Sequence, residues 1–285
     1  MKVRFGIGLG GTSQPAGLAE AAEAILEHGF DSIWLPEILT RPGPDPLAAL
    51  AWLSGRHPRL KIGTTMLLPG RNLVRLAKQL ATLDQLSSGR FLVTFVPGIA
   101  QGAEREAVGV PVRDRGAAIE HGLPYVRRLL DGEEVDGVIL DPRPAQAVFS
   151  MWLGGTVPAS LDRCGRLADG WLPSLLFPED AAAGREVIEL AAAGAGRTVD
   201  PEHFGVSIGY SLGPMPEATR ASLSARARGR DLESLFPQSL EALRGLVEGH
   251  IAAGFSKFVL RPSGPVDSWS DELGALSAAV HDLQT

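Results

Sequence analysis

The chain has 285 residues, 45% of them hydrophobic, and a formal net charge of -6 at pH 7. A chain of this length buries roughly three quarters of its unfolded surface, so we expect a large core. The negative charge and the lack of dense Lys/Arg clusters exclude nucleic acid and anionic membranes as partners, because such binding depends on neutralising phosphates. No apolar run reaches the roughly 18 residues of a membrane span, and no cleavable signal is recognisable, so we expect a cytoplasmic protein.

The first half of the chain alternates short apolar runs with amphipathic segments. Strands are expected at residues 4–8, 32–35 and 91–96, and in the apolar run that opens at Lys61. Helices are expected at residues 18–27, after an N-cap at Asp45, from Leu73 to Ser87 and at residues 116–130. Residues 97–113 are expected to be a loop. A strand, a helix and a further strand in this order form a βαβ unit, so the strands should be parallel.

The second half repeats this alternation after an irregular or hairpin crossover at residues 131–147. Strands are expected at residues 149–153, 170–173, 204–212 and 257–260. Helices are expected at residues 159–168, 178–193, 240–253 and 268–283. Eight alternations predict a (β/α)8 TIM barrel, formed by one domain that spans residues 1–285. Residues 213–239 are too long for a plain loop and should form a helical excursion over the barrel mouth.

The active site of such a barrel lies at the C-terminal ends of its strands, and few charged residues follow the strands here. Glu37 could orient a cofactor or transfer a proton, or it could form a salt bridge with Arg41 or Arg71. Arg261 could hold a phosphate or carboxylate, or cap a loop. The histidines fall on helices or before strands, no metal-binding motif occurs, and Cys164 lies among apolar residues as a buried, inert thiol would. A mouth so poor in acid-base groups suits an organic cofactor.

Two glycine motifs could bind such a cofactor. Gly154, Gly155 and Thr156 place backbone N–H groups at the start of a helix, whose dipole favours an anion by about 0.3 to 1 kcal/mol. The alternative is a tight turn capped by Thr156 without a ligand. Gly6, Gly8 and Gly11 satisfy the GxGxxG pattern of dinucleotide-binding folds. Residues 12–15 separate this pattern from the next helix, which argues against a Rossmann unit.

Several segments resemble the bacterial luciferase-like monooxygenase superfamily, especially its branch that uses the deazaflavin coenzyme F420. The matching segments are GFDSIWLPE (residues 29–37), GTTMLLP (63–69), GRFLVTFVPG (89–98), the pair Arg115 and Glu120, and WLGGTVPASLDRCGRLADGWLPS (152–174). The last is the most specific, since its glycine turn and its Ala-Asp-Gly-Trp flank one helix. The resemblance also implies a non-prolyl cis peptide bond between Thr65 and Met66, which costs about 3 to 4 kcal/mol and needs support from its surroundings.

Two positions depart from the family pattern: Ile38 where relatives carry His, and Ile99 where they carry Glu. A positioned acid or base is typically worth about 10² to 10⁴ in rate. Sugar-phosphate and alcohol dehydrogenation therefore do not carry over to this chain. Reduction of an apolar or conjugated substrate, or a monooxygenase-like reaction, fits better, with Thr12, Glu37 or a lid residue supplying any proton.

The resemblance implies an oxidoreductase that exchanges hydride between coenzyme F420 and a small organic substrate. The expected catalytic residues are Glu37 and Thr12; cofactor contacts are expected from Gly8, Glu37, Thr65, Met66, Pro97, Gly98, Gly154, Gly155 and Thr156, and substrate contacts from Arg41, Ser174 and Arg261. The same fold with FMN and oxygen or NAD(P)H is the alternative, and a non-catalytic flavin-binding or cofactor-free barrel is another. The family also implies a homodimer through the second and third barrel helices, where Ala48, Ala49 and Ala77 would allow close approach.

Overall fold

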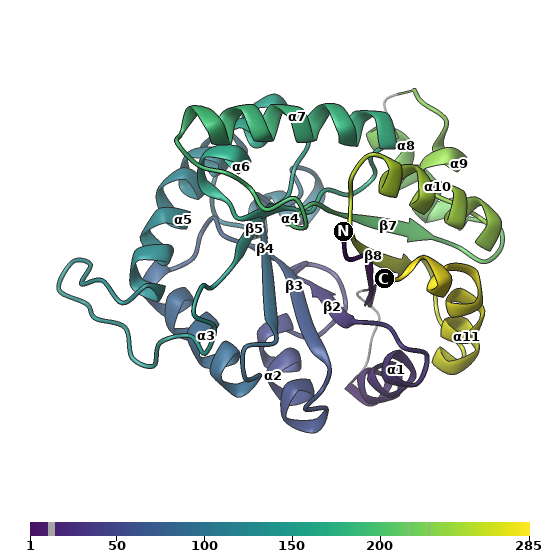
Figure 1. Cartoon of the computed structure of the whole chain (residues 1–285), viewed down its shortest axis with the longest axis horizontal. Coiled ribbons are helices and arrows are strands. Elements are labelled where there is room, and N and C mark those ends of the chain that lie inside the picture. The colour runs from purple at the N-terminus through teal and green to yellow at the C-terminus, as the bar shows by residue number, and fades with distance from the viewer. Residues whose placement is uncertain (11–14, 216, 228) are drawn as a thin grey trace.

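The strands of the chain form one parallel sheet that curls into a barrel. The computed structural model describes residues 1–10, 15–215, 217–227 and 229–285, and in these ranges eight strands pair in the order β6-β5-β4-β3-β2-β1-β8-β7. Their bounds are β1 (Arg4–Gly8), β2 (Ser32–Pro36), β3 (Lys61–Leu67), β4 (Phe91–Val96), β5 (Met151–Leu153), β6 (Gly170–Trp171), β7 (Gly205–Tyr210) and β8 (Lys257–Pro262). Isolated parallel bridges from Trp171 to Phe204 and from Ser174 to Ser207 join the two ends of this order (Figure 1). The predicted (β/α)8 TIM barrel is confirmed.

Helices surround the barrel, and short polar side chains fix where several of them begin (Figure 1). They are α1 (Pro15–Glu27), α2 (Pro46–Arg56), α3 (Leu73–Leu86), α4 (Gly102–Ala107), α5 (Arg115–Leu130), α6 (Pro158–Leu167), α7 (Pro178–Gly194), α8 (Glu217–Ala227), α9 (Leu232–Leu235), α10 (Leu240–Ala252) and α11 (Trp269–Val280), with 3-10 turns at Val112–Asp114 and His281–Leu283. The Asp45 carboxylate accepts a hydrogen bond of 2.9 Å from the Ala48 N–H, so the predicted N-cap is confirmed. The Asn72 side chain caps α3 in the same way.

The two faces of the strands pack into different layers, because successive side chains point to opposite sides. Outward-facing residues such as Phe5 and Ile7 belong to the main core between strands and helices. A separate cluster inside the barrel contains Trp34, Trp152, Leu172 and Val259. Glycines make room for its two indoles: a Cβ at Gly63 would lie 2.5 Å from the Trp34 ring, and one at Gly170 would lie 2.4 Å from the Trp152 ring. The indoles fill the middle of the barrel, so a ligand would have to bind nearer the strand ends.

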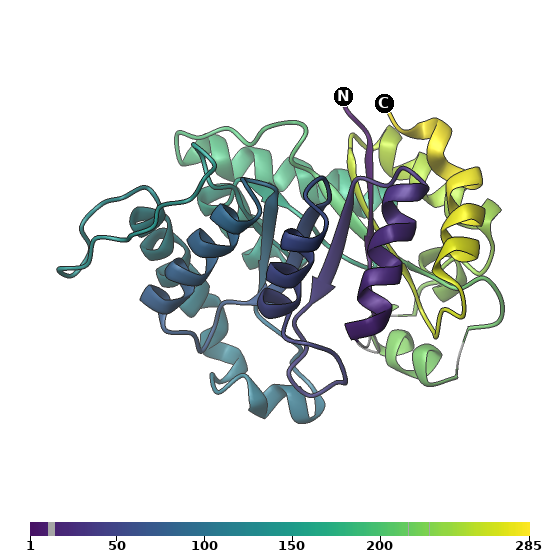
Figure 2. The same cartoon turned by 90° about the horizontal axis from the view of Figure 1, so that it is seen from below.

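The C-terminal ends of the strands lie opposite the two chain termini, which meet beside β1 (Figure 2). There the Thr285 N–H donates to the Val3 carbonyl oxygen over 3.3 Å. The segments after β4 and after β7 cover the other end, which is the barrel mouth (Figure 2). Helices α8 and α9 lie in the second of these segments and confirm the predicted helical excursion at 213–239, whose positions 216 and 228 are outside the described residues.

Two expectations for the connecting segments need correction. Residues 97–113 contain α4 and the start of the 3-10 turn Val112–Asp114 rather than a plain loop. Asp141–Pro142 is the single cis peptide bond in the described ranges, so the prediction of one between Thr65 and Met66 is wrong. The crossover at 131–147 is irregular as expected, with one antiparallel bridge between Val135 and Val138. None of the helices in the described ranges is long and apolar enough to span a membrane.

Candidate active site

Glu37 lies at the top of β2 and connects it to β3. The Leu67 N–H donates to Glu37 Oε2 over 2.7 Å, and the Glu37 N–H donates to the Thr65 carbonyl oxygen over 2.8 Å. The other carboxylate oxygen pairs with Arg71, so the salt bridge considered from the sequence is present. Burial raises the pKa of Glu37 above its usual range, although the Arg71 charge and the Leu67 amide act in the opposite direction. Glu37 is thus a buried, oriented carboxylate at the mouth.

Arg261 crosses the interior of the barrel near its mouth. Its Nε donates to the Ser207 hydroxyl over 2.7 Å, which ties β8 to β7. Gly8 on β1 leaves room for the arginine stem, since a Cβ at this position would lie 2.3 Å from Arg261 Cγ. Ser174 pairs with Ser207 through a backbone bridge on the same side of the barrel. Three of the predicted site residues, Gly8, Ser174 and Arg261, therefore gather around the β6, β7, β8 and β1 sector.

Thr65 and Met66 point to opposite sides of β3. Met66 is fully buried in the main core, whereas Thr65 is half-buried and shares its face with Gly63, which packs against Trp34 inside the barrel. Met66 could therefore meet a bound ring only through its backbone. Among the other predicted residues, Arg41 is exposed and its positive charge acts on Glu104, while Thr12 lies outside the described residues.

Arg115 organises the segment after β4, a role that the sequence analysis missed. This side chain is 1% exposed, and its guanidinium donates to the carbonyl oxygens of Pro97, Ile99, Arg105 and Val110 over 2.7 to 3.2 Å. The same guanidinium lies 3.3 Å from where a Cβ at Gly98 would be, and Gly98 has a φ of +86°. Pro97 and Gly98 are consequently held in a conformation that only glycine adopts readily at the second position.

Glu104 was also missed, because nothing in the sequence separates it from the exposed Glu106 on the same short helix. It is 4% exposed and accepts hydrogen bonds from the Leu39 N–H at 3.0 Å, the Thr40 N–H at 3.0 Å and the Thr40 hydroxyl at 2.8 Å. Burial alone would raise the pKa of Glu104, but these hydrogen bonds lower it below its usual value. The carboxylate therefore fastens the loop after β2 to α4.

Gly154, Gly155 and Thr156 form a turn between β5 and α6. A Cβ at Gly154 would lie 2.8 Å from Val96 Cγ1, and Gly155 has a φ of +103°. No side chain caps the N-terminus of α6, and the Thr156 hydroxyl has no hydrogen-bond partner in the described part of the chain. The Gly154 N–H already donates to the Phe95 carbonyl oxygen over 2.9 Å, so the Gly155 and Thr156 N–H groups are the ones that could bind an anion such as the phosphate of a cofactor.

The remaining candidate groups are apolar or chemically inert. Ile38 lines a small recess with Gly10 and Pro36, and the side chain of Ile99 is 42% exposed. Cys164 is buried and its thiol pKa is raised by burial, which confirms an unreactive thiol. The described residues contain no group of side chains that could hold a metal ion.

The parallel barrel, with a glycine turn at its C-terminal end, defines a protein of the (β/α)8 class. The chain belongs to the luciferase-like monooxygenase family, whose profile matches residues 2–269. It is 29% identical to an F420-dependent glucose-6-phosphate dehydrogenase of Nakamurella multipartita over 65% of this chain and 60% of that protein. The chain thus spans less than two thirds of the length of this relative.

Solved structures agree with the fold. An F420-dependent secondary alcohol dehydrogenase in complex with an F420-acetone adduct superposes with a TM-score of 0.82 at 18% identity and full coverage of both chains. A monooxygenase from Streptomyces bottropensis superposes with a TM-score of 0.76 at 21% identity, covering 98% of this chain and 99% of the other. At these identities the likeness concerns the barrel and its connections.

Proposed function

We propose that the chain is an oxidoreductase that exchanges hydride between coenzyme F420 and a small organic substrate. The observation that carries this proposal is the uncapped turn at Gly154, Gly155 and Thr156 beside a mouth with few acid-base groups. Family membership and the F420-dependent relative in Nakamurella multipartita support it. When bound, F420 would supply the hydride chemistry that these side chains lack.

The residues around the mouth would divide the work of binding. The turn would hold the phosphate, while Thr65, the Met66 backbone, Pro97 and Gly98 would contact the ring, with Gly8 opposite. Glu37 would orient the ring or hold a proton, since its burial favours the protonated form while Arg71 opposes it. Thr12 is a second proposed proton donor. Arg41, Ser174 and Arg261 would face the substrate.

The turn can be tested with a matched pair of glycine substitutions. Gly155 and Gly196 both have a positive φ, of +103° and +68°, but Gly196 follows α7 and has open space around its Cβ position. Gly155→Val should weaken F420 binding at least tenfold in a fluorescence-quenching titration. Gly196→Val also places a branched side chain at a positive φ, but inside the left-handed region, and it should leave the affinity unchanged. Equal losses from both variants would remove the turn from the binding site.

The alternative cofactor is FMN, used with oxygen or NAD(P)H on the same fold. Parallel titrations with F420 and FMN separate the two, and indifference to both would contradict both. A non-catalytic flavin-binding barrel is the remaining alternative, favoured by Ile38 and Ile99. Tight F420 binding without turnover of enones, aldehydes and nitroaromatics would support it.

We also propose a cytoplasmic homodimer that associates through α2. Ala49 and Ala77 are buried in the barrel's own core, so they cannot contact a partner, but Ala48 is exposed one turn from Trp52, whose side chain is 47% exposed. An exposed small residue beside an exposed indole is a suitable surface for close packing. Light scattering should give a dimer mass for the wild type and a monomer mass for Trp52→Glu.

A further inference from the structure

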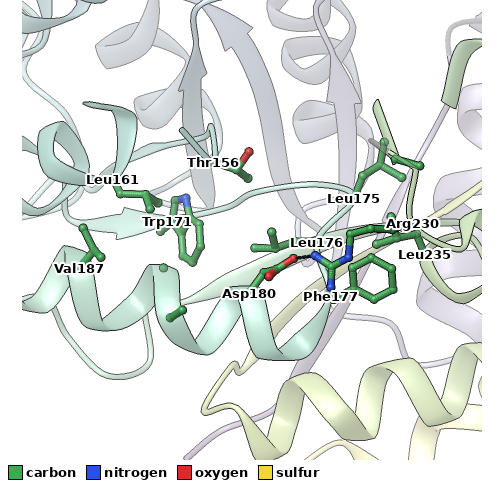
Figure 3. Close-up of a pocket in the computed structure, with 13 residues that line it drawn as sticks. Thr156, Leu161, Trp171, Leu175, Leu176, Phe177, Asp180, Val187, Arg230 and Leu235 are labelled. Atoms are coloured by element: carbon green, nitrogen blue, oxygen red, sulfur yellow. Dashed lines mark hydrogen bonds and ion pairs between the residues drawn. The ribbon is translucent and has the colours of Figure 1, made fainter. Parts of the chain in front are cut away.

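A groove of about 390 Å³ lies beside the glycine turn, on the outer side of the barrel wall (Figure 3). Large apolar side chains line it from α6, β6, α7 and the segments that follow β6 and β7: Leu161, Trp171, Leu175, Phe177, Val187 and Leu235. Trp171 belongs to the outer core, whereas the next residue, Leu172, belongs to the cluster inside the barrel. This Trp171 groove is therefore separate from the barrel interior.

The charged groups at the groove already neutralise one another. Arg230 pairs with Asp180, and its Nη2 lies 2.8 Å from Glu179 Oε1. The same guanidinium lies 3.8 Å from the centroid of the Phe177 ring (Figure 3). Two carboxylates thus surround one cation, so an anionic ligand would meet a negative local charge. An uncharged ligand would meet no such penalty.

The walls of the groove are held in place by specific contacts. Trp171 Nε1 donates to the Gly155 carbonyl oxygen over 2.9 Å, which fixes the indole against the glycine turn. A Cβ at Gly184 would lie 2.6 Å from the same ring, so α7 approaches the indole as closely as a glycine allows. Leu175 at the rim has a φ of +54°, in the left-handed region that leucine rarely adopts. Such backbone strain is common where a structure holds a ligand.

We propose that the Trp171 groove binds an uncharged apolar small molecule, namely an aromatic ring or an alkyl chain with at most one polar group. The apolar body would lie along Leu175, Phe177 and Val187, above the buried Trp171 indole. The polar group would stay at the solvent-exposed side of the groove near Val187, which is 41% exposed. The volume is at the lower end of known ligand sites, which range from roughly 300 to 1,000 Å³, so it suits a small molecule rather than a protein segment. The proposal does not depend on the function proposed above.

The first test uses N-phenyl-1-naphthylamine, an uncharged aromatic probe whose fluorescence rises in apolar surroundings. The full-length protein should give a saturable rise with one site per chain. Primary alcohols from butanol to octanol should displace the probe, with an affinity gain of about fourfold for each added CH₂, as expected from about 0.8 kcal/mol per buried CH₂. Non-saturable binding, or an affinity that does not change with chain length, would overturn the proposal.

A matched pair of variants locates the probe. Ala183 lines the groove and Ala193 lies ten residues further along α7, about 15 Å away along the helix axis, and both are exposed. Ala183→Trp should reduce probe affinity at least tenfold by filling the groove, and Ala193→Trp should leave it unchanged. If Ala183→Trp folds poorly, Val187→Asp, which places a charge at an exposed wall position, should give the same loss. Wild-type affinity in a folded groove variant would contradict the assignment.

Coenzyme F420 provides the last arm of the test. Saturating F420 should leave probe binding intact, because the coenzyme is anionic and the groove presents a surplus carboxylate. Full displacement of the probe would assign the groove to the cofactor and overturn the proposal. If F420 itself fails to bind, the proposed function fails, while the probe and variant results still decide the groove.

Discussion

Removal of the Glu104 side chain should open the loop after β2 without unfolding the barrel. Glu104→Ala removes three hydrogen bonds to a charged acceptor, two from backbone N–H groups and one from the Thr40 hydroxyl. Bonds of this kind contribute about 1.5 to 3 kcal/mol each when fully buried. Leu39 and Thr40 are exposed and can reach water once released, so we expect a combined loss of about 2 to 4 kcal/mol. The open population of the loop should therefore rise roughly 30- to 1,000-fold.

Hydrogen exchange of the backbone amides of Leu39 and Thr40 measures this opening directly. In Glu104→Ala the exchange of these two amides should accelerate roughly 30- to 1,000-fold. The free energy of unfolding of the whole protein in urea should change far less, because the loop lies outside the sheet. Glu106→Ala is the matched control, since the Glu106 side chain on the same helix is 85% exposed. The reasoning is refuted if the two variants exchange alike, or if Glu104→Ala exchanges as the wild type does.

The hydrogen bonds from the loop after β2 to the Glu104 carboxylate should weaken as the pH falls. The pKa of Glu104 is lowered from its ordinary value of 4.5 in the folded protein, so the carboxylate contributes stability above pH 4.5. That contribution should be lost as the pH falls through the folded-state pKa. Exchange at Leu39 and Thr40 in the wild type should accordingly accelerate below pH 4.5, beyond the intrinsic pH dependence of exchange, and should show no such step in Glu104→Ala.

Two further predictions concern the stability of the barrel. Gly63→Ala should lower the free energy of unfolding in urea by about 1 to 3 kcal/mol, because its Cβ would lie 2.5 Å from the Trp34 ring, whereas Gly55→Ala on the open face of α2 should raise it by about 0.5 to 1 kcal/mol. His250 donates from Nε2 to the Leu176 carbonyl oxygen at 3.1 Å, and burial lowers its pKa to about 4 from 6.5. Folding favours the neutral form of His250, so the free energy of unfolding should fall by about 3 kcal/mol between pH 6.5 and pH 4. In His250→Gln this fall should be absent. If the change in unfolding free energy over this pH range differs by less than 1 kcal/mol between wild type and His250→Gln, the reasoning is contradicted.

The alternation of strands and helices could be predicted because each element carries its own periodic pattern. Local chemistry also placed the Asp45 cap and the glycine turn, which depend on residues adjacent in sequence. The strand β6, in contrast, has two residues, fewer than the four expected, and contributes to closure through isolated bridges. Such pairing is determined by distant partners, so no local pattern predicts its length.

The candidate site was less predictable, because its key contacts join segments far apart in sequence. Glu104 accepts hydrogen bonds from Thr40 and Leu39, which lie 64 and 65 positions away in the sequence. Nothing near Glu104 in the chain distinguishes it from Glu106. Arg115 was noticed as a family match, but its four carbonyl partners depend on how residues 97–110 fold around it. Alternation along β3 already implied that Thr65 and Met66 face opposite sides, a signal that could have been used.

The acidic and basic side chains found at the mouth are already engaged in contacts within the protein. Glu37 binds Arg71 and the Leu67 amide, Glu104 binds the loop after β2, and Arg261 binds Ser207. These contacts link the ends of β2, β3 and β4, and separately those of β7 and β8, so they rigidify the rim before any ligand arrives. A group that both anchors the rim and exchanges protons would disturb this rim at each turnover, so of the two roles proposed for Glu37 the arrangement favours orienting the ring. The arrangement is therefore better suited to positioning a reactive cofactor than to performing acid-base chemistry with its own side chains.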